Sequence, residues 1–261
     1  VMIRMRDIYN NISFEKIDMI RDDLEFIQKP CVTSKLSNNI CTCKKPSHIK
    51  NPKDICFRPK GYLMMCRFFS GEMQKHPSIQ KYDGYIRFDD DSFLIEPYKN
   101  QDDFINSLIN HKYVYRSLFR ESQDQSALFK FTIKFCADNG MDSLQILRNC
   151  VSNKVLNSNY GYQGIAPYNN FHYSSLDVWK HPIIKKYIDE LEDIGGCLKK
   201  GWMDANIHAM IIFLIMPNLN MSVENIRDFG YRHNRAFSAI GNQSIVYMEN
   251  ERFFPLVDLS T

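Results

Sequence analysis

Three consecutive aspartates, Asp89, Asp90 and Asp91, are the feature of this 261-residue chain with the clearest chemical meaning. Carboxylates this close repel one another unless they hang in water at a turn or a cation lies among them. In an Asp-x-Asp arrangement the outer pair can turn to one side and offer hard oxygens to Mg²⁺ or Mn²⁺. Such an ion can hold the phosphates of a nucleotide and neutralise a departing diphosphate. Because the motif is common by chance, a solvated turn and a metal site both stay open.

The acidic run follows a segment that reads as a strand. Residues 85–88, YIRF, have the composition of a short buried strand, and ligands in open α/β folds gather beyond the carboxyl ends of strands. Upstream, residues 61–73, GYLMMCRFFSGEM, carry apolar side chains at helical spacing, which predicts a helix with one buried stripe.

Downstream segments supply the remaining elements. Residues 129–135, FKFTIKF, alternate apolar and polar side chains, which predicts a strand with one buried face. Another strand is expected within 169–177, NNFHYSSLD. One amphipathic helix is expected over 181–196, where glycines end it, and a second over 202–217, where Pro217 ends it. Strands alternating with helices predict an α/β sandwich.

Composition sets the broad class. With 44% hydrophobic residues the chain can bury a substantial core, and we expect one domain over 1–261. Its 33 Lys and Arg nearly balance 30 Asp and Glu, which argues against a nucleic-acid partner. The longest apolar run, 209–217, is too short to span a membrane, so no transmembrane segment is expected in this chain. No signal peptide is visible at the start, which is Val1.

Half of the eight cysteines cluster in one polar segment that is expected to be a loop. Zinc binding, disulfides in an oxidising lumen and unpaired thiols are all open for this cluster, because its spacing lacks paired zinc knuckles. The four are Cys31, Cys41, Cys43 and Cys56.

Six ordered blocks carry a resemblance to a known family. They are GYLMMCRFFSG, HPSIQKYDGYIRFDDD, FKFTIKF, FHYSSLDVWKHP, WMDANIHA and DFGYRHN, together spanning about 61–237. In order and approximate spacing they resemble the fungal α-1,2-mannosyltransferases of glycosyltransferase family 15. Residues 1–60 are not matched convincingly, and 238–261 form a C-terminal segment.

The resemblance implies a fold, a reaction and a location. The fold would be GT-A, an α/β/α sandwich with a mixed central sheet. The enzyme would transfer mannose from GDP-mannose to the 2-hydroxyl of a mannoside on a glycan or glycoprotein, with retention of configuration and with Mn²⁺ (or Mg²⁺) as cofactor. The compartment would be a Golgi-like lumen of the secretory pathway, although the chain shows no signal or anchor and a cytoplasmic location stays open.

The resemblance also implies site residues. Asp89 and Asp91 fall on the acidic motif at the metal, where the family has Glu-Pro-Asp, so the first carboxylate is one methylene shorter here. His233 falls on the histidine that completes the metal site. Asp177 falls on a glutamate near the anomeric carbon, as a nucleophile or stabiliser of the transition state. Front-face return without a covalent intermediate, and a role of Asp177 as the N-cap of the following helix, stay open.

Further positions match with less defined roles. Tyr62 aligns with an active-site tyrosine, and Asp204 could hold a sugar hydroxyl or cap the helix that it opens. Arg67 and Arg87 could contact donor phosphates or form structural ion pairs, and Arg87 could pair with the acidic run. Tyr231, in the final block, is a further candidate for donor or acceptor binding. His208 is expected to be a hydrogen-bonded core histidine.

Other functions remain open at this level. The same fold could use a different nucleotide sugar, because donor selectivity resides in the shape of the pocket. Two features favour a catalytically silent relative that binds a sugar or nucleotide. The acidic motif is Asp-Asp-Asp where the family has Glu-Pro-Asp, and Asp177 is one methylene shorter than the family's glutamate. A zinc-stapled nucleic-acid module around residues 31–56 would need a basic patch, which the near-even charge balance disfavours.

Overall fold

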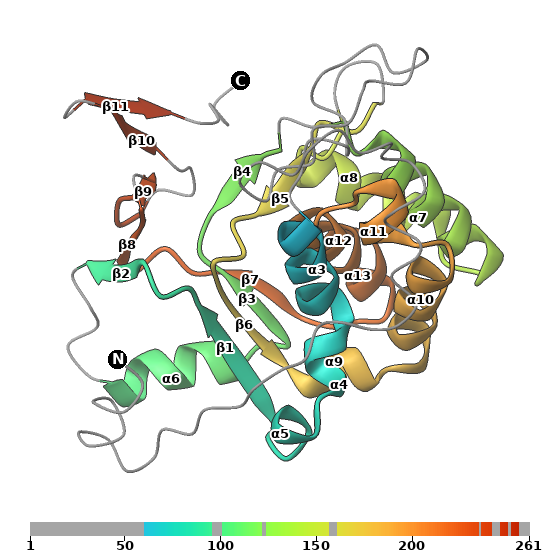
Figure 1. Ribbon diagram of the computed structural model, residues 1–261, viewed down its shortest axis with the longest axis horizontal. Coiled ribbons are helices and arrows are strands. Elements are labelled where there is room, and N and C mark those ends of the chain that lie inside the picture. Colours follow the sequence, from blue (N-terminus) through green and yellow to red (C-terminus); the bar gives the residue numbers. More distant parts are fainter. Residues whose placement is uncertain are drawn as a thin grey trace.

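The computed structural model describes most of the chain from residue 60 onward (Figure 1). The described residues are 60–95, 101–121, 124–156, 161–234, 236–241, 246–249 and 252–255. Among these residues, no helix is long and apolar enough to cross a membrane. Residues 1–59, which include the cysteine cluster of 31–56, and residues 256–261 lie outside the described ranges.

The main sheet has four strands of mixed direction. Its order is β1 (Gly84–Phe88), β6 (Phe171–Ser175), β3 (Tyr113–Tyr115) and β7 (Val223–Asn225). The β1–β6 and β3–β6 pairs are antiparallel, whereas β3 and β7 run parallel. The strands predicted at YIRF and within 169–177 are therefore confirmed.

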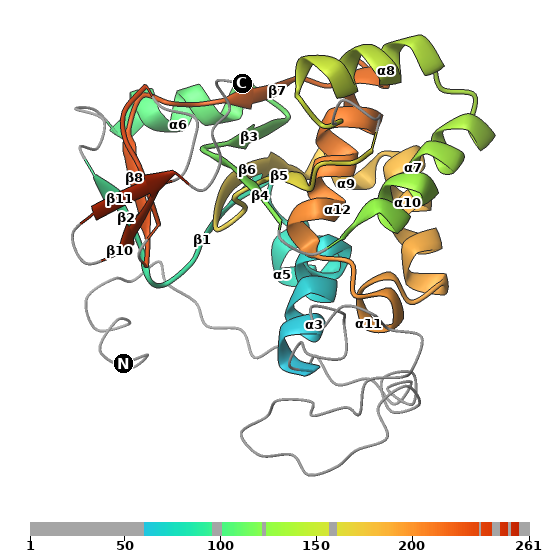
Figure 2. The same ribbon diagram turned by 90° about the horizontal axis from the view of Figure 1, so that it is seen from above.

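Side chains alternate across this sheet and supply two cores. Tyr113 and Tyr115 of β3 belong to the larger core, whereas Val114 between them belongs to a smaller one. The smaller core includes Phe171 of β6 and is covered by α6 (Gln101–Ile109), as Figure 2 shows. The larger core lies on the opposite face under the remaining helices, so helices cover both faces of the sheet, as an α/β sandwich requires.

Two helical segments pack on the larger core. The first runs through α3 (Lys60–Arg67), a π-helical turn at Phe68–Glu72 and α4 (Met73–Lys75), followed by α5 (Pro77–Gln80). The second runs through α12 (Asp204–Met210), a π-helical turn at Ile211–Ile215 and α13 (Met216–Asn218). Both were predicted. The second is buried along nearly all of its length, and its buried side chains include the polar Asp204, Asn206 and His208.

The other helices complete this layer. They include α8 (Ser143–Ser152), α9 (Leu176–Lys180), α10 (Pro182–Asp193) and α11 (Gly196–Lys200). The predicted helix over 181–196 corresponds to α10, which His181 caps through its side chain. Gly195 follows it at φ 69°, a left-handed conformation that glycine adopts without strain.

The prediction of a strand at FKFTIKF is wrong. These residues lie in α7 (Ser126–Asp138), in which Leu128, Thr132, Phe135 and Cys136 are buried. Their spacing of four, three and one is helical, and the Thr132 hydroxyl lies 2.7 Å from the Tyr187 hydroxyl of α10. The alternation of phenylalanine and lysine suggests a strand with one buried face. Phe129 and Phe131, however, are only half-buried, so the alternating positions do not form one buried face.

A second, antiparallel sheet adjoins the first. Its order is β11 (Arg252–Pro255), β10 (Val246–Glu249), β9 (Ala236–Ser238), β8 (Gly230–His233) and β2 (Ser92–Ile95). A separate pair joins β4 (Leu118–Arg120) to β5 (Ile165–Pro167). Because β2 follows β1 after only three residues, Asp89–Asp91 form the link between the two sheets.

Four cysteines fall within the described chain. Cys66, Cys136, Cys150 and Cys197 are buried and unpaired. Burial raises the pKa of each thiol, so these side chains are neutral packing groups at ordinary pH.

Candidate active site

Strand register brings the acidic link against two other segments. The backbone N–H of Asp89 donates to the carbonyl of Asn170 at 3.1 Å, one pair beyond the Phe88–Phe171 pair of β1 and β6. On the other side, the N–H of Asn234 donates to the carbonyl of Asp91 at 3.3 Å, next to the Ser92–His233 pair of β2 and β8. The two sheets therefore meet at the aspartates.

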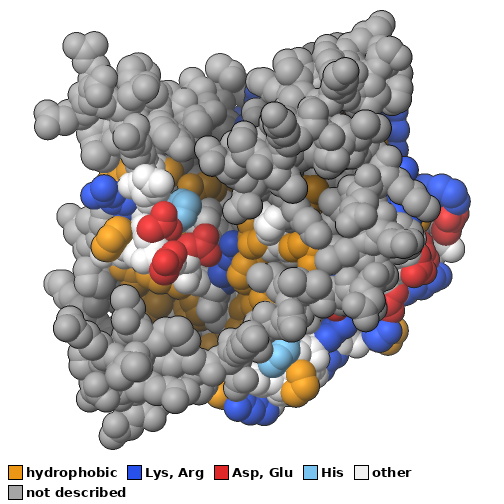
Figure 3. All heavy atoms as spheres, viewed as in Figure 1, with side chains coloured by type: hydrophobic (Ala, Val, Ile, Leu, Met, Phe, Trp, Pro, Cys, Tyr) orange, Lys and Arg blue, Asp and Glu red, His pale blue; other side chains and the backbone are white. Residues whose placement is uncertain are grey.

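The imidazole of His233 lies between the predicted metal ligands. Its Nε2 is 2.8 Å from Oδ1 of Asp91 and 3.8 Å from Oδ2 of Asp89. The His233 side chain is mostly buried, at 19% exposed, whereas Asp91 is half exposed. Figure 3 shows acidic side chains gathered beside a histidine on this face of the molecule. The structure thus joins two segments that are more than 140 residues apart in sequence.

A short turn before β6 holds this histidine, and sequence reasoning missed it. The hydroxyl of Tyr168 lies 2.7 Å from Nδ1 of His233, and Nδ2 of Asn170 lies 3.3 Å from Nε2. Nδ2 of Asn170 also donates to Oδ2 of Asp89. Both ring nitrogens are therefore contacted from one turn, which fixes the rotation of the ring. The available signal was the pair Asn169 and Asn170, at the start of the segment expected to contain a strand.

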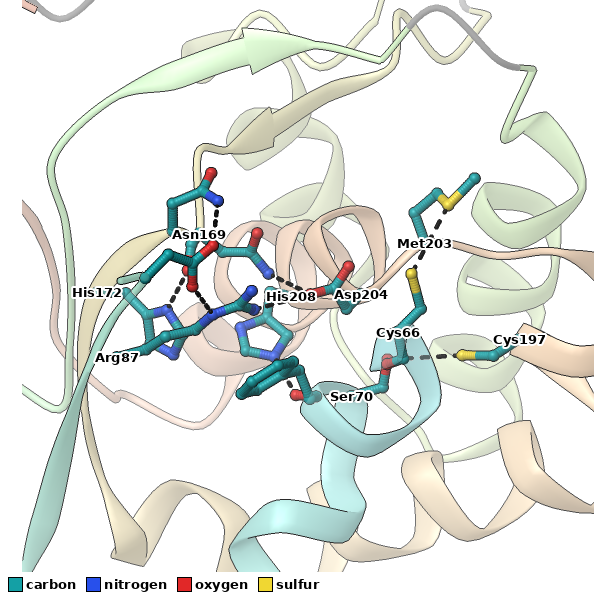
Figure 4. A network of polar contacts seen from close by, with 12 residues as sticks. Cys66, Ser70, Arg87, Asn169, His172, Cys197, Met203, Asp204 and His208 are labelled. Carbon is teal, nitrogen blue, oxygen red and sulfur yellow. Dashed lines mark hydrogen bonds and ion pairs between the residues drawn. The ribbon is translucent and has the colours of Figure 1, made fainter. Parts of the chain in front are cut away.

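Arg87 connects the acidic link to a buried carboxylate. Its Nε donates to Oδ1 of Asp89 at 3.0 Å. Its Nη1 donates to Oδ2 of Asp204 at 2.9 Å, and Figure 4 shows these two side chains facing each other. The expectation that Arg87 pairs with the acidic run is confirmed. Asn169 also donates to Oδ2 of Asp204, at 2.8 Å, and the guanidinium lies 3.7 Å from the ring centre of Phe69. This buried charge pair is thus hydrogen-bonded and packed on an aromatic face.

Asp204 is free for a role other than capping. It lies in the first turn of α12, where Met203 is the N-cap and no side chain caps the helix. Its carboxylate is 6% exposed and is held by Arg87 and Asn169 instead. An oriented carboxylate beside the acidic link is able to accept a hydrogen bond from a sugar hydroxyl.

Two buried, neutral histidines, His172 and His208, lie near the Arg87–Asp204 ion pair (Figure 4). His208 is confirmed as a core histidine: its Nδ1 lies 2.8 Å from the Tyr113 hydroxyl and its Nε2 lies 2.9 Å from the Phe69 carbonyl. Burial lowers the pKa of His208 to about 4. Burial and the neighbouring His208 also lower the pKa of His172, whose ring stacks on Tyr113. Neither adds positive charge beside Arg87 at neutral pH.

Asp177 lies at the other end of the strand pair. Gly84 pairs with Ser175, so Asp177 follows the end of β6 that is remote from Asp89. Five strand residues, about 16 Å of chain, separate the two ends. The Asp177 side chain is 65% exposed and 2.6 Å from Nζ of Lys112, whose hydrogen bond lowers its pKa. Ser175, not Asp177, is the N-cap of α9.

The remaining predicted residues lie outside this group. Nε of Arg67 is 2.7 Å from Glu192 of α10, so the structural ion-pair interpretation is the one that the structure shows. Tyr62 packs, half-buried, against the larger core in the first turn of α3. Tyr231 is buried in β8, and its hydroxyl lies 2.7 Å from Oγ of Ser92, which ties β8 to β2.

The predicted metal ligands have the donor types that a divalent cation needs. Two carboxylates and an imidazole suit Mn²⁺. Two ligands of a small octahedral ion, each about 2.1 Å from it, lie about 3 Å apart in cis and about 4.2 Å in trans. The 2.8 Å from His233 to Asp91 is close to the cis separation, whereas the 3.8 Å to Asp89 lies between the two values. Within the described chain, however, no three His, Cys, Asp or Glu side chains are placed to hold a metal ion together, so Asp89, Asp91 and His233 match the cation by ligand type and not by a preassembled geometry.

Comparison with known proteins settles the family. Residues 10–252 match the family model described as glycolipid 2-alpha-mannosyltransferase. The chain belongs to this family. The resemblance read from the six sequence blocks is therefore confirmed.

Several curated relatives are fungal proteins. Glycolipid 2-alpha-mannosyltransferase 2 of Candida albicans is 26% identical over 206 residues, which cover 72% of this chain and 40% of the relative. O-glycoside alpha-1,2-mannosyltransferase omh1 of Schizosaccharomyces pombe is 29% identical over 178 residues, covering 67% and 44%. The chain thus spans less than half the length of these relatives.

Solved structures show the same fold. Core-mannan synthase A from Aspergillus fumigatus, in a Mn/GDP form, superposes with a TM-score of 0.59 at 22% identity, covering 74% of this chain and 53% of that one. The mannosyltransferase Ktr4p from Saccharomyces cerevisiae, in complex with GDP, gives 0.55 at 24% identity, covering 67% and 46%. The expected GT-A type of α/β sandwich with a mixed sheet is confirmed.

Proposed function

We propose that this chain is the catalytic portion of a retaining, metal-dependent glycosyltransferase. It would transfer mannose from GDP-mannose to the 2-hydroxyl of a mannoside on a glycan or glycoprotein. The observation that carries the proposal is the convergence of Asp89, Asp91 and His233 at one end of β1, in a chain of a mannosyltransferase family. A Golgi-like lumen of the secretory pathway is the compartment that family membership favours.

The metal role follows from the donor set. Asp89, Asp91 and His233 would hold Mn²⁺ (or Mg²⁺), which when bound neutralises charge developing on a departing diphosphate. Tyr168 orients His233, and Arg87 orients Asp89 while adding fixed positive charge behind it. These groups are in place before substrate arrives, which is what electrostatic catalysis needs.

Stereochemistry is proposed to follow the front-face route. The C1–O bond to the diphosphate breaks, the acceptor oxygen bonds C1 on the same face, and the departing phosphate takes the acceptor proton. This route needs no carboxylate on the opposite face, and it is supported by the position of Asp177 at the far end of β6, where it contacts Lys112. Asp204, held by Arg87 and Asn169, is the buried carboxylate that can instead accept a sugar hydroxyl near the diphosphate.

The decisive experiment measures GDP binding with and without Mn²⁺. We expect Mn²⁺ to tighten GDP binding in the wild-type chain, and His233→Ala to abolish that gain. His111→Ala, in the turn after α6, is the matched control that should keep it. Equal GDP affinity with and without Mn²⁺ in the wild type contradicts the metal role. A comparison of hydrolysis of GDP-mannose, UDP-glucose and UDP-N-acetylglucosamine separates this donor from the alternatives, and binding without turnover indicates a silent relative.

A further inference from the structure

A buried histidine is hydrogen-bonded to the turn at 168–170 that contacts the candidate site. His172 follows this turn in β6 and is 1% exposed. Its Nδ1 lies 3.0 Å from the backbone carbonyl of Asn169 (Figure 4). The side chain of Asn169 donates to Oδ2 of Asp204 at 2.8 Å. His172 therefore contacts the backbone from which this amide projects toward the buried carboxylate.

The contacts of His172 determine which ring nitrogen carries the hydrogen. A backbone carbonyl only accepts, so Nδ1 must be the donor to Asn169. Nε2 lies 3.3 Å from the Tyr85 hydroxyl, which accepts from Nε2 of Gln74 at 2.7 Å and so has its own hydrogen to donate. The ring is thus neutral, with hydrogen on Nδ1 and a lone pair on Nε2. Burial lowers the pKa of His172, which agrees with a neutral ring.

Neighbouring rings hold the imidazole of His172 in one orientation. It stacks on Tyr113 with ring centres 5.3 Å apart, and it meets the rings of Tyr85 and His208 edge-on at 5.5 and 5.2 Å. The register pairs His172 with Arg87, so both side chains lie on the same face of the main sheet. The direction of the Nδ1–H bond is therefore fixed by the core.

Resting on the proposed function, we propose that His172 is a positioning residue for mannosyl transfer. Its Nδ1–H holds the Asn169 carbonyl, which sets the direction of the Asn169 amide and, through it, that of the Asp204 carboxylate. Loss of this donor leaves a buried carbonyl without its partner, so the turn shifts to find another. Arg87 still holds Asp204 after that shift, so the carboxylate moves but stays in the site. Small displacements of a group that orients substrate are costly in rate.

The test compares two substitutions that each keep one edge of the ring. The amide nitrogen of His172→Asn takes the place of Nδ1 and can still donate to Asn169, whereas that of His172→Gln takes the place of Nε2 and cannot. Both remove the stack on Tyr113, so thermal melts should show similar losses of stability.

The rate is measured as kcat for transfer from GDP-mannose to methyl α-mannoside. We expect kcat to stay within about threefold of the wild type in His172→Asn and to fall by about tenfold or more in His172→Gln. His111→Asn, in the turn after α6, is the control and should keep the wild-type rate. Nitrogen-15 NMR of the imidazole rings in the wild type should show hydrogen on Nδ1 of His172.

The outcomes separate this inference from the proposed function. A wild type that transfers mannose, with equal rate losses in His172→Asn and His172→Gln, overturns the positioning role alone, because packing rather than the donor would then matter. Hydrogen on Nε2 of His172 in the wild type overturns it as well, whatever the variants do. If the wild type transfers no mannose, the proposed function fails and the positioning role fails with it.

Discussion

The guanidinium of Arg87 lies 2.9 Å from the carboxylate of Asp204, and both side chains are less than a tenth exposed. Arg87 lies in β1 and Asp204 is the first residue of α12, so one ion pair joins the main sheet to this helix. The same arginine reaches Asp89 at the surface. The stability of the fold and the placement of the site are therefore coupled through Arg87.

Breaking this pair should destabilise the protein strongly. We expect Arg87→Met to lower the free energy of unfolding by about 3–5 kcal/mol, because it leaves Asp204 buried without its cation. Arg87→Met combined with Asp204→Leu should recover much of that loss, since no unpaired charge remains. Urea denaturation of the two variants checks this, and equal losses in both would show that packing rather than charge dominates.

The two candidate carboxylates should respond differently to one substitution. Asp177→Asn should leave mannosyl transfer close to the wild-type rate, because that side chain is exposed and bound to Lys112. Asp204→Asn should lower kcat, because an amide replaces the oriented carboxylate. Rates at saturating donor, with melting temperatures to account for folding, measure the contrast. A large loss for Asp177→Asn would restore it as a catalytic candidate.

Acid should destabilise the fold through its buried histidines. Burial lowers the pKa of His208 to about 4, below the usual value of about 6.5, so the unfolded chain binds a proton that the folded chain does not. Stability from His208 is full above about pH 6.5 and is lost as pH falls toward about 4, by up to about 1.4 kcal/mol per pH unit. Unfolding free energies at neutral pH and at two acidic points above the folded pKa test this. His208→Gln should flatten the slope.

A matched pair of glycines tests the packing of the first helical segment. A Cβ at Gly71 would lie 2.5 Å from Cγ2 of Ile188 of α10, whereas a Cβ at Gly61 would meet nothing within 4 Å. Gly71→Ala should therefore cost about 1–3 kcal/mol of unfolding free energy through overpacking. Gly61→Ala, in the helix α3, should be neutral or stabilise by up to about 1 kcal/mol. Thermal unfolding gives both values, and equal melting temperatures would contradict the packing argument.

Sequence reasoning succeeded where one local pattern had one physical interpretation. The helix 181–196 has an apolar stripe, a proline at its start and glycines at its end, and α10 follows it closely. The prediction for FKFTIKF was wrong because seven residues can match both an alternating and a helical pattern of apolar side chains. Packing against α10 buries the helical face, and the segment is a helix. The turn at 168–170 escaped notice because its role depends on partners distant in sequence.

By itself the sequence determined the family, the α/β class and the candidate metal ligands, because ordered motif blocks and residue types carry that information. Tertiary structure alone decided which candidates meet. Strand register puts His233 beside Asp91 and Asp89, whereas the antiparallel direction of β6 carries Asp177 to the far end of the sheet. Distances between residues far apart in the chain are fixed by pairing and packing, which no local spacing encodes.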